Sequence, residues 1–362
     1  AKDLGPVMKI FSERHDRCCD LHKAIEKRAP VKLNYDEEAF KLSKLKAGER
    51  GYDSRKGKLD KLAEKVAAHD KLVEAARAEI AKVDARIGAM RAKYAADPEF
   101  QKHEALLDNG IDLARLTYPE VRTLRCQMQY IFQDPYSSLN PRMTVANIIG
   151  EGLLAHKYCK KANERMHEEI LQTMEDCGLA PYFLHRYPHQ FSGGMKQRIV
   201  IAIALACEPK LILADEPTTA LDVTIQAQML GLINELQKRL NTAMILITHD
   251  LGVVAQTCEK VMVMYAGEAI EYGTAEDIFE TTQRHPYTQG LFNAIPKLDE
   301  NTKRLEAIEG MMADPTQKIE GCRFADRCKY ATAACKKAQK MREVTPGHFI
   351  RCCRFDPPQS NT

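Results

Sequence analysis

The chain has 362 residues, of which 44% are hydrophobic and 28% are charged, and its formal net charge at pH 7 is +3. These values are ordinary for a globular protein, so they exclude collagen-like, mucin-like and wholly disordered chains. The length predicts two or three domains, and the small net charge gives no indication of binding to nucleic acid or to an anionic membrane. The apolar runs are shorter than the roughly 18 residues of a membrane-spanning helix, and the first residues show no secretory signal pattern.

Residues 1–108 are predicted to form a helical insertion. From Leu59 to Met90 a 3-4-3-4 spacing of mostly apolar residues continues without a proline, which is typical of paired helices. The positions of this seam are Leu59, Leu62, Val66, His69, Val73, Ala76, Ile80, Val83, Ile87 and Met90. We therefore expect an antiparallel helical hairpin or a short coiled coil, which serves either as a surface insertion or as an arm that docks a partner.

Residues 109–292 are predicted to form an α/β domain. Short apolar runs at 211–214, 244–247 and 261–265 alternate with helical stretches such as 200–205. This alternation is typical of a parallel sheet that helices cover on both faces.

Two acids, Asp215 and Glu216, directly follow the apolar run 211–214. The carboxyl ends of parallel strands are where α/β sheets hold their ligands. An aspartate at such an end can bind Mg²⁺ beside nucleotide phosphates, and an adjacent glutamate can polarise an attacking water. Taken alone, the pair is a moderate signal, and the alternative is a strand that ends in a polar turn.

Three more polar segments point to the same chemistry. Ser192-Gly193-Gly194 precedes an apolar helix, so Ser192 is expected to cap that helix, while the glycines leave backbone N–H groups open to an anion. Gln133 and His249 each follow a predicted strand. A glutamine there can contact Mg²⁺ or water, and a histidine can contact a γ-phosphate or the attacking water.

In this order, the segments resemble the ATP-binding subunits of ABC transporters over residues 109–362. The matching positions are Gln133 in the Q-loop, Ser192, Gly193, Gly194 and Met195 in the signature loop, Asp215 and Glu216 in the Walker B motif, Asp222 in the D-loop and His249 as the switch histidine. The resemblance implies a P-loop NTPase-like α/β core with a helical subdomain at about 140–200, which binds ATP and Mg²⁺. It implies that Glu216, His249 and Gln133 are catalytic and that Asp215 and Gln133 hold the Mg²⁺. Ser192, Gly193, Gly194, Asp215 and Asp222 would bind nucleotide, with Ser192, Gly193 and Gly194 completing the site of an opposing subunit.

Finer features resemble the oligopeptide/dipeptide (peptide/nickel) importer branch of that family. They are the runs 132–142 and 214–224, the segment His285-Pro286-Tyr287-Thr288 and a cysteine-containing tail. This resemblance implies an ATP-hydrolysing subunit that powers peptide uptake from the cytoplasmic face of the cell membrane. Its partners would be a second ATPase subunit, two transmembrane permeases and, indirectly, an extracytoplasmic peptide-binding protein. No nucleic-acid partner is expected.

The family's phosphate loop, Gly-x-x-x-x-Gly-Lys-[Ser/Thr], is absent from the sequence. The nearest string, 51–59, has five residues between its glycines and ends in Leu59 instead of a hydroxyl residue. Two explanations are open. Either the loop and the first strands lie upstream of Ala1, or the chain is a non-hydrolysing subunit that lends its signature loop to a partner's ATP site. A third candidate, an SMC-like repair ATPase, also contains a coiled coil, but in that class the coiled coil follows the Q-loop, whereas here it precedes Gln133.

Residues 293–362 are predicted to form a cysteine-rich C-terminal domain. Five of the chain's 12 cysteines lie here, and without an export signal reduced thiols or a metal site are expected rather than disulfides. The spacing of Cys322, Cys328, Cys335 and Cys352 matches neither a common zinc pattern nor a ferredoxin run, so Zn²⁺, an iron–sulfur cluster and a metal-free tail remain open. The family resemblance favours a [4Fe–4S] cluster on these four residues, with Cys352 preferred to Cys353.

Overall fold

The computed structural model describes residues 5–104, 112–159, 162–219, 221–294, 308–314 and 316–355. The chain divides into two compact units, Ala1–Ile245 and Leu246–Thr362, and each is described by itself. The expected boundary between residues 108 and 109 lies outside the described residues. Within the described ranges, no helix combines the length and the apolar character that crossing a membrane requires.

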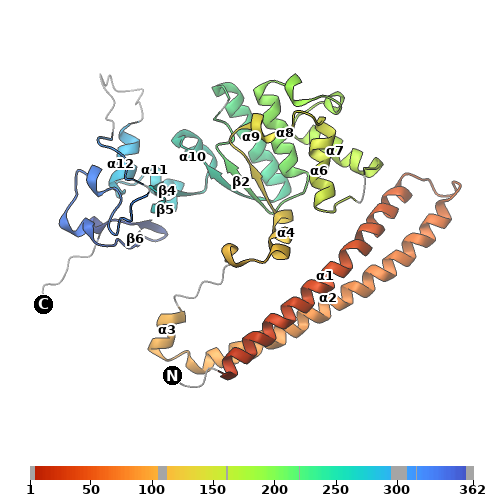
Figure 1. Cartoon of the computed structure of the whole chain (residues 1–362), viewed down its shortest axis with the longest axis horizontal. Helices are drawn as coiled ribbons and strands as arrows, with labels where there is room; N and C mark the ends of the chain where they lie inside the picture. The colour runs from red at the N-terminus through yellow and green to blue at the C-terminus, as the bar shows by residue number, and fades with distance from the viewer. Residues whose placement is uncertain are drawn as a thin grey trace. The chain divides into compact units, whose positions relative to one another are not determined.

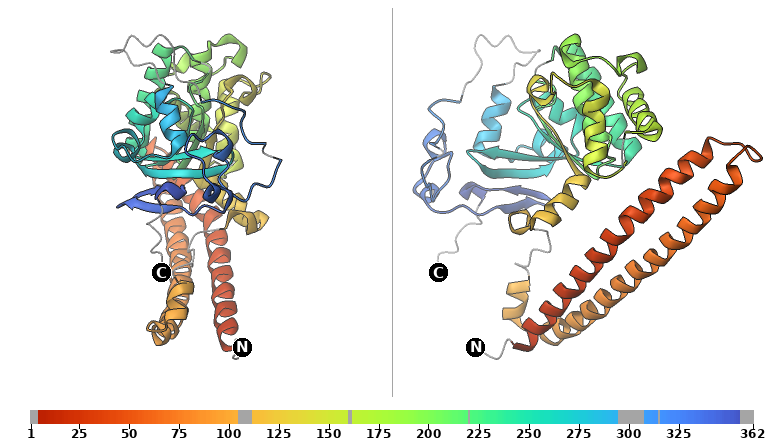
Figure 2. Two further views of the ribbon diagram at one scale, coloured as in Figure 1. Left: turned by 90° about the vertical axis from the view of Figure 1, so that its left-hand side faces the viewer. Right: turned by 45° about the vertical axis from the view of Figure 1, so that its right-hand side comes forward.

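Two long helices, α1 (Gly5–Ser43) and α2 (Tyr52–Tyr94), pack against each other along their length (Figures 1 and 2). Every position of the predicted seam is buried or half-buried, and Val73 and Val83 are fully buried. Ion pairs join the two helices at Arg14–Asp84 and Glu13–Arg86. The string 51–59 starts α2 and follows another helix, so it lacks the strand that precedes a phosphate loop.

A three-stranded sheet in the order β1-β2-β3 is formed by β1 (Met128–Ile131), β2 (Leu211–Asp215) and β3 (Ala243–Ile247). The boundary between the two units falls within β3, after Ile245. β1 and β2 are parallel, with Met128 opposite Leu211. The apolar runs 211–214 and 244–247 are therefore strands, as predicted. The expectation that helices cover both faces is wrong at β3, where Ile245 and Ile247 are 50% and 49% exposed, because no described element buries that part of the strand.

Helices pack around this sheet (Figure 1). The predicted helical subdomain at about 140–200 is confirmed by α6 (Val145–Ala155), α7 (Glu164–Asp176) and α8 (Gly193–Leu205), which contact one another. α6 and α7 approach closely at Gly150, where an added Cβ would lie 2.6 Å from the Met166 methyl. The remaining helices of the first unit are α3 (Pro98–Glu104), α4 (Tyr118–Gln127), α5 (Pro135–Ser138) and α9 (Val223–Leu240).

The second unit contains an antiparallel sheet in the order β4-β5-β7-β6. Its strands are β4 (Lys260–Tyr265), β5 (Glu268–Thr274), β6 (Arg342–Thr345) and β7 (His348–Ile350). The prediction that run 261–265 joins the parallel sheet is wrong. Ala266 and Gly267 take positive φ values of 47° and 84°, which suits a two-residue hairpin turn, so β4 pairs directly with β5.

Three helices, α10 (Leu251–Thr257), α11 (Ala275–Phe279) and α12 (Pro286–Asn293), belong to the same unit. Its apolar core consists of Val261, Val263, Tyr265, Ile270, Ile278 and Phe324. Because β7 pairs with β5, with Ile350 opposite Glu271, the sheet fixes the chain on both sides of the cysteine-rich segment.

Candidate functional site

Polar side chains gather where β1 and β2 end. Asp215 is the last residue of β2, Glu216 follows it, and Gln133 stands just beyond β1. Parallel strands bring these ends to one edge of the sheet. The Gln133 amide donates a hydrogen bond to Glu216 Oε2 at 2.7 Å, so the structure brings these three predicted residues together.

The carboxylate of Glu216 is held in place by its neighbours. Besides Gln133, the Thr219 hydroxyl donates to Glu216 Oε2 at 3.0 Å. The backbone of Glu216 takes a φ of 44°, a left-handed conformation that costs a non-glycine residue roughly 1–3 kcal/mol and is concentrated at functional sites. A fixed, partly exposed carboxylate of this kind can orient and polarise a water.

Tyr130 was not predicted as a site residue. Its hydroxyl donates to Asp215 Oδ2 at 2.7 Å, and this hydrogen bond, more than burial, raises the pKa of Tyr130. A tyrosine within a predicted strand, three residues before Gln133, is the signal that would have indicated it. Carboxylate and amide oxygens at this edge fit the ligand preference of Mg²⁺.

The signature loop lies at the start of α8. Ser192 occupies the N-cap position, but its side chain makes no capping hydrogen bond, so the predicted cap is wrong. Ser192 is exposed and its side chain does not accept from the first N–H groups of α8, and such groups can bind an anion. Gly194 is required by packing, because a Cβ there would lie 2.9 Å from the Ile225 side chain of α9. At Gly193 a Cβ would be 3.5 Å from the Tyr136 hydroxyl.

The two other predicted residues lie elsewhere. Asp222 is the N-cap of α9 and accepts a hydrogen bond from the Ile225 amide at 3.0 Å. His249 is exposed and belongs to the second unit, between β3 and α10. The predicted site residues that lie together at one sheet edge of the first unit are therefore Gln133, Asp215 and Glu216.

A second site is a small cavity of about 10 Å³ in the second unit. The cysteines that line it are Cys322, Cys328, Cys335, Cys352 and Cys353. Gly321 allows two backbone segments to meet here, because a Cβ would lie 2.3 Å from the carbonyl oxygen of Cys335. That same carbonyl accepts the Cys322 amide at 2.8 Å. The four predicted cysteines thus converge, together with Cys353.

The thiols of this cavity differ in acidity. Burial raises the pKa of Cys322 and Cys328, and that of Cys352 to about 11. At Cys335 burial is opposed by hydrogen bonds from Thr332 and from the Cys353 thiol, 3.6 Å away, and its pKa is lowered. Among the described residues no three His, Cys, Asp or Glu side chains are arranged around one point to hold a single ion.

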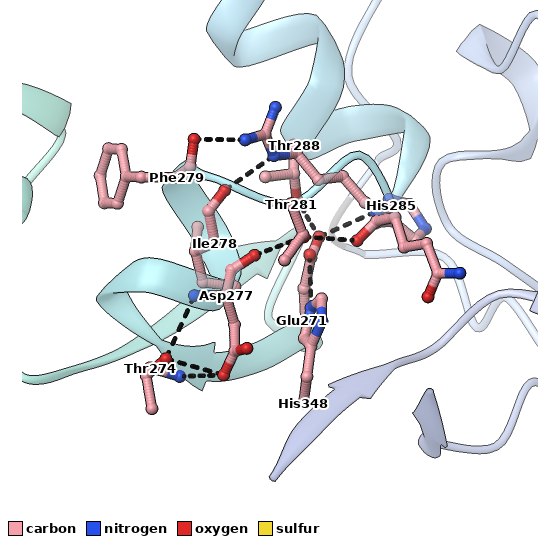
Figure 3. Close-up of polar contacts among 11 residues, drawn as sticks. Glu271, Thr274, Asp277, Ile278, Phe279, Thr281, His285, Thr288 and His348 are labelled. Carbon is pink, nitrogen blue, oxygen red and sulfur yellow. Dashed lines mark hydrogen bonds and ion pairs between the residues drawn. The ribbon is translucent and has the colours of Figure 1, made fainter. Parts of the chain in front are cut away.

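A buried polar network borders this cavity (Figure 3). Glu271 on β5 is fully buried, and its Oε2 accepts the backbone N–H of His285 at 2.8 Å and the Thr288 hydroxyl at 2.6 Å. Its Oε1 lies 2.9 Å from Nε2 of His348, which is also fully buried. The network joins β5, β7 and the start of α12, and His285 itself lines the cysteine cavity.

Comparison with known proteins agrees with the resemblance. Residues 94–219 match the ABC transporter family, and residues 270–335 match the C-terminal region of oligopeptide/dipeptide transporters. The oligopeptide transport ATP-binding protein OppD of Salmonella typhimurium is 47% identical over 248 residues, which cover 67% of this chain and 73% of that protein. The dipeptide transport ATP-binding protein DppD of Bacillus subtilis is 49% identical over 249 residues, 68% of this chain and 72% of that protein. The chain therefore belongs to the ATP-binding protein family of ABC transporters.

Proposed function

We propose that this chain is the ATP-hydrolysing subunit of an importer for oligopeptides or dipeptides. The observation that carries the proposal is its 47% identity to a protein of oligopeptide transport over 73% of that protein's length. The match of residues 270–335 to the C-terminal region of oligopeptide/dipeptide transporters points to the same substrate class.

Each site residue has a distinct role in this proposal. Asp215, with Gln133, holds Mg²⁺ on the phosphates of ATP, and Glu216 polarises the water that attacks the γ-phosphate. The hydrogen bond from Gln133 to Glu216 supports this, because it aligns the base with the metal ligand. His249 contacts the γ-phosphate.

The signature loop is assigned to the ATP that is bound by the opposing subunit of a dimer. The uncovered N-terminus of α8, at Ser192, Gly193 and Gly194, would bind the nucleotide of an opposing subunit, with Asp222 near the contact between the two. This arrangement makes the chain one half of a homodimer or heterodimer. The dimer would sit at the cytoplasmic face of the membrane on two permeases, supplied with peptide by an extracytoplasmic binding protein.

The proposed domains are a helical insertion at 1–108, with its α1–α2 pair as a short coiled coil, the ATPase at 109–292 and the cysteine-rich domain at 293–362. ATP hydrolysis also needs a phosphate loop, which these 362 residues lack. The exposed Ile245 and Ile247 lie on one face of β3, so among the described residues that face lacks the covering layer that such a sheet has on each side. The absent loop favours a second candidate function, a non-hydrolysing subunit that completes a partner's site.

A transport assay tests the proposed function. The natural polypeptide, assembled with its permeases in lipid vesicles, is expected to accumulate a labelled tetrapeptide when ATP is supplied, and not with a non-hydrolysable analogue. Hydrolysis that is insensitive to peptide, with no uptake, would contradict the peptide importer. Binding of the chain to an active partner, with no hydrolysis of its own, would favour the non-hydrolysing subunit.

We further propose that the cavity cysteines hold a [4Fe–4S] cluster. The chemical type of the donors fits, because five thiols line one cavity and such clusters are bound by cysteine thiolates. At about 10 Å³ the cavity has room for roughly one water, so the side chains must move outward around a cluster. When bound, the cluster would cross-link the segments that carry Cys322, Cys328, Cys335 and Cys352.

Reconstitution with ferrous iron and sulfide under anaerobic conditions tests the cysteine site. We expect a brown protein with charge-transfer absorbance and bound iron, and loss of both in Cys335→Ser. Cys258→Ser is the matched control, because Cys258 lies in the same unit but does not line the cavity. A colourless, iron-free wild-type protein would reject the proposal.

A further inference from the structure

His285 lines the cysteine cavity and carries a buried ring nitrogen that has no partner among the described residues. This nitrogen is Nε2, and the residue is 1% exposed. A buried polar atom without a partner lowers stability, so an acceptor bound in this cavity within reach of Nε2 would complete the hydrogen bonding of the ring.

The hydrogen bonds of the ring decide which nitrogen carries the proton. Nδ1 of His285 accepts the backbone N–H of Tyr287 at 3.1 Å, so in the neutral ring the proton is on Nε2. Burial lowers the pKa of His285 to about 4, so the ring is neutral at pH 7. At neutral pH Nε2 is therefore a donor without a positive charge.

The surrounding network fixes the ring. Glu271 accepts the backbone N–H of His285 at 2.8 Å and the Thr288 hydroxyl at 2.6 Å, while its other oxygen lies 2.9 Å from His348 Nε2. Figure 3 shows Glu271 between His285 and Thr288 on one side and His348 on the other. The donor is thus held by a buried carboxylate on β5 and does not depend on a mobile side chain.

We propose that Nε2–H of His285 donates a hydrogen bond to a sulfur atom of the iron–sulfur group in the cysteine cavity and thereby raises its reduction potential. This inference rests on the cysteine site proposed above. Hydrogen bonds to the sulfur atoms of such groups stabilise the more negative, reduced state. His285 is a positioning residue in this scheme and not a ligand.

Two substitutions of His285 separate the role of Nε2–H as a donor from the role of Nδ1 as the acceptor that caps α12. In His285→Asn the side-chain oxygen can still accept the Tyr287 amide, but no donor remains at the Nε2 position. In His285→Gln an amide N–H takes approximately the Nε2 position and the cap is lost. Each full-length variant is reconstituted with ferrous iron and sulfide and titrated with dithionite under anaerobic conditions, with absorbance and iron content as readouts.

At the potential where the wild type is half reduced, we expect the ratio of reduced to oxidised protein to fall about tenfold in His285→Asn, which is about 59 mV for one electron. His285→Gln should recover most of this shift. Thr274→Ala is the control, because it removes the α11 cap of the same unit and should lower the melting temperature without changing the potential.

The outcomes are distinguishable. An iron-loaded His285→Asn protein with the wild-type potential overturns the donor role and leaves the cysteine site intact. Iron loss from both His285 variants, with Thr274→Ala still loaded, also overturns it, because the glutamine supplies the donor. Iron loss from His285→Asn alone supports the donor role. A wild-type protein that takes up no iron overturns the cysteine site and this inference with it.

Discussion

Replacement of Glu216 by glutamine is expected to lower ATP turnover by the natural polypeptide by roughly 10²–10⁴-fold, the range for loss of a general base. Glutamine keeps the size of the side chain and an oxygen that can accept from Gln133 and Thr219, so the local geometry is retained. It cannot take a proton from the attacking water. Nucleotide binding should persist, because Asp215 and the signature loop are unchanged.

Steady-state phosphate release and equilibrium binding of a fluorescent ATP analogue measure the two quantities separately. Glu235→Gln is the matched control, because Glu235 is an exposed residue of α9 in the same unit and its loss should leave turnover unchanged. Wild-type turnover in Glu216→Gln would reject the catalytic role of Glu216. Loss of binding together with turnover would indicate that the residue holds the nucleotide site in shape instead.

The motifs of the nucleotide site were predictable because their chemistry is local. Asp215 and Glu216 end a buried run, and that alone places them at the ligand edge of a parallel sheet. The seam of α2 was predictable for the same reason, since a 3-4 spacing of apolar residues specifies one helix face. Its ten positions are buried or half-buried against α1.

The errors concern features that depend on tertiary context. The pattern of run 261–265 is that of one more buried parallel strand. Positive φ values at Ala266 and Gly267 reverse the chain direction after it, so that it pairs with β5 in the antiparallel sense. Ser192 has the right type and position for a helix cap, yet its side chain makes no capping hydrogen bond. Tyr130 was missed because its partner, Asp215, is 85 residues away in the sequence.

At the cysteine cavity, one part of the site was predictable from the sequence and the other part depends on tertiary contacts. The crowding of cysteines from residue 322 onward is visible in the sequence, but their spacing alone does not identify which metal, if any, they bind. The structure adds Cys353 to the lining and brings in His285, Glu271 and His348, which lie on three separate segments. Strand pairing between β5 and β7 makes that contact, and the pairing is not visible in the local pattern of either segment.

Glu271→Ala is expected to destabilise the second unit by at least about 3 kcal/mol, since each buried donor left without an acceptor costs about 1–3 kcal/mol. Three groups lose their acceptor: the His285 amide, the Thr288 hydroxyl and His348 Nε2. All three residues are at most 1% exposed, so in the intact fold bulk solvent does not reach the donors that the carboxylate leaves. Glu271→Gln should cost less, because one oxygen remains as an acceptor.

Hydrogen exchange of the β5 and β7 amides, read by mass spectrometry on the full chain, reports this loss as faster exchange in the second unit. Glu268→Ala is the matched control: Glu268 lies on the same strand but forms a partly exposed ion pair with Arg323 at 3.3 Å, and such pairs contribute about 0–1 kcal/mol. Equal exchange in the Glu271→Ala and Glu268→Ala proteins would show that the buried network does not hold β5, β7 and α12 together. A large difference would identify Glu271 as the residue that joins the sheet to the wall of the cysteine cavity.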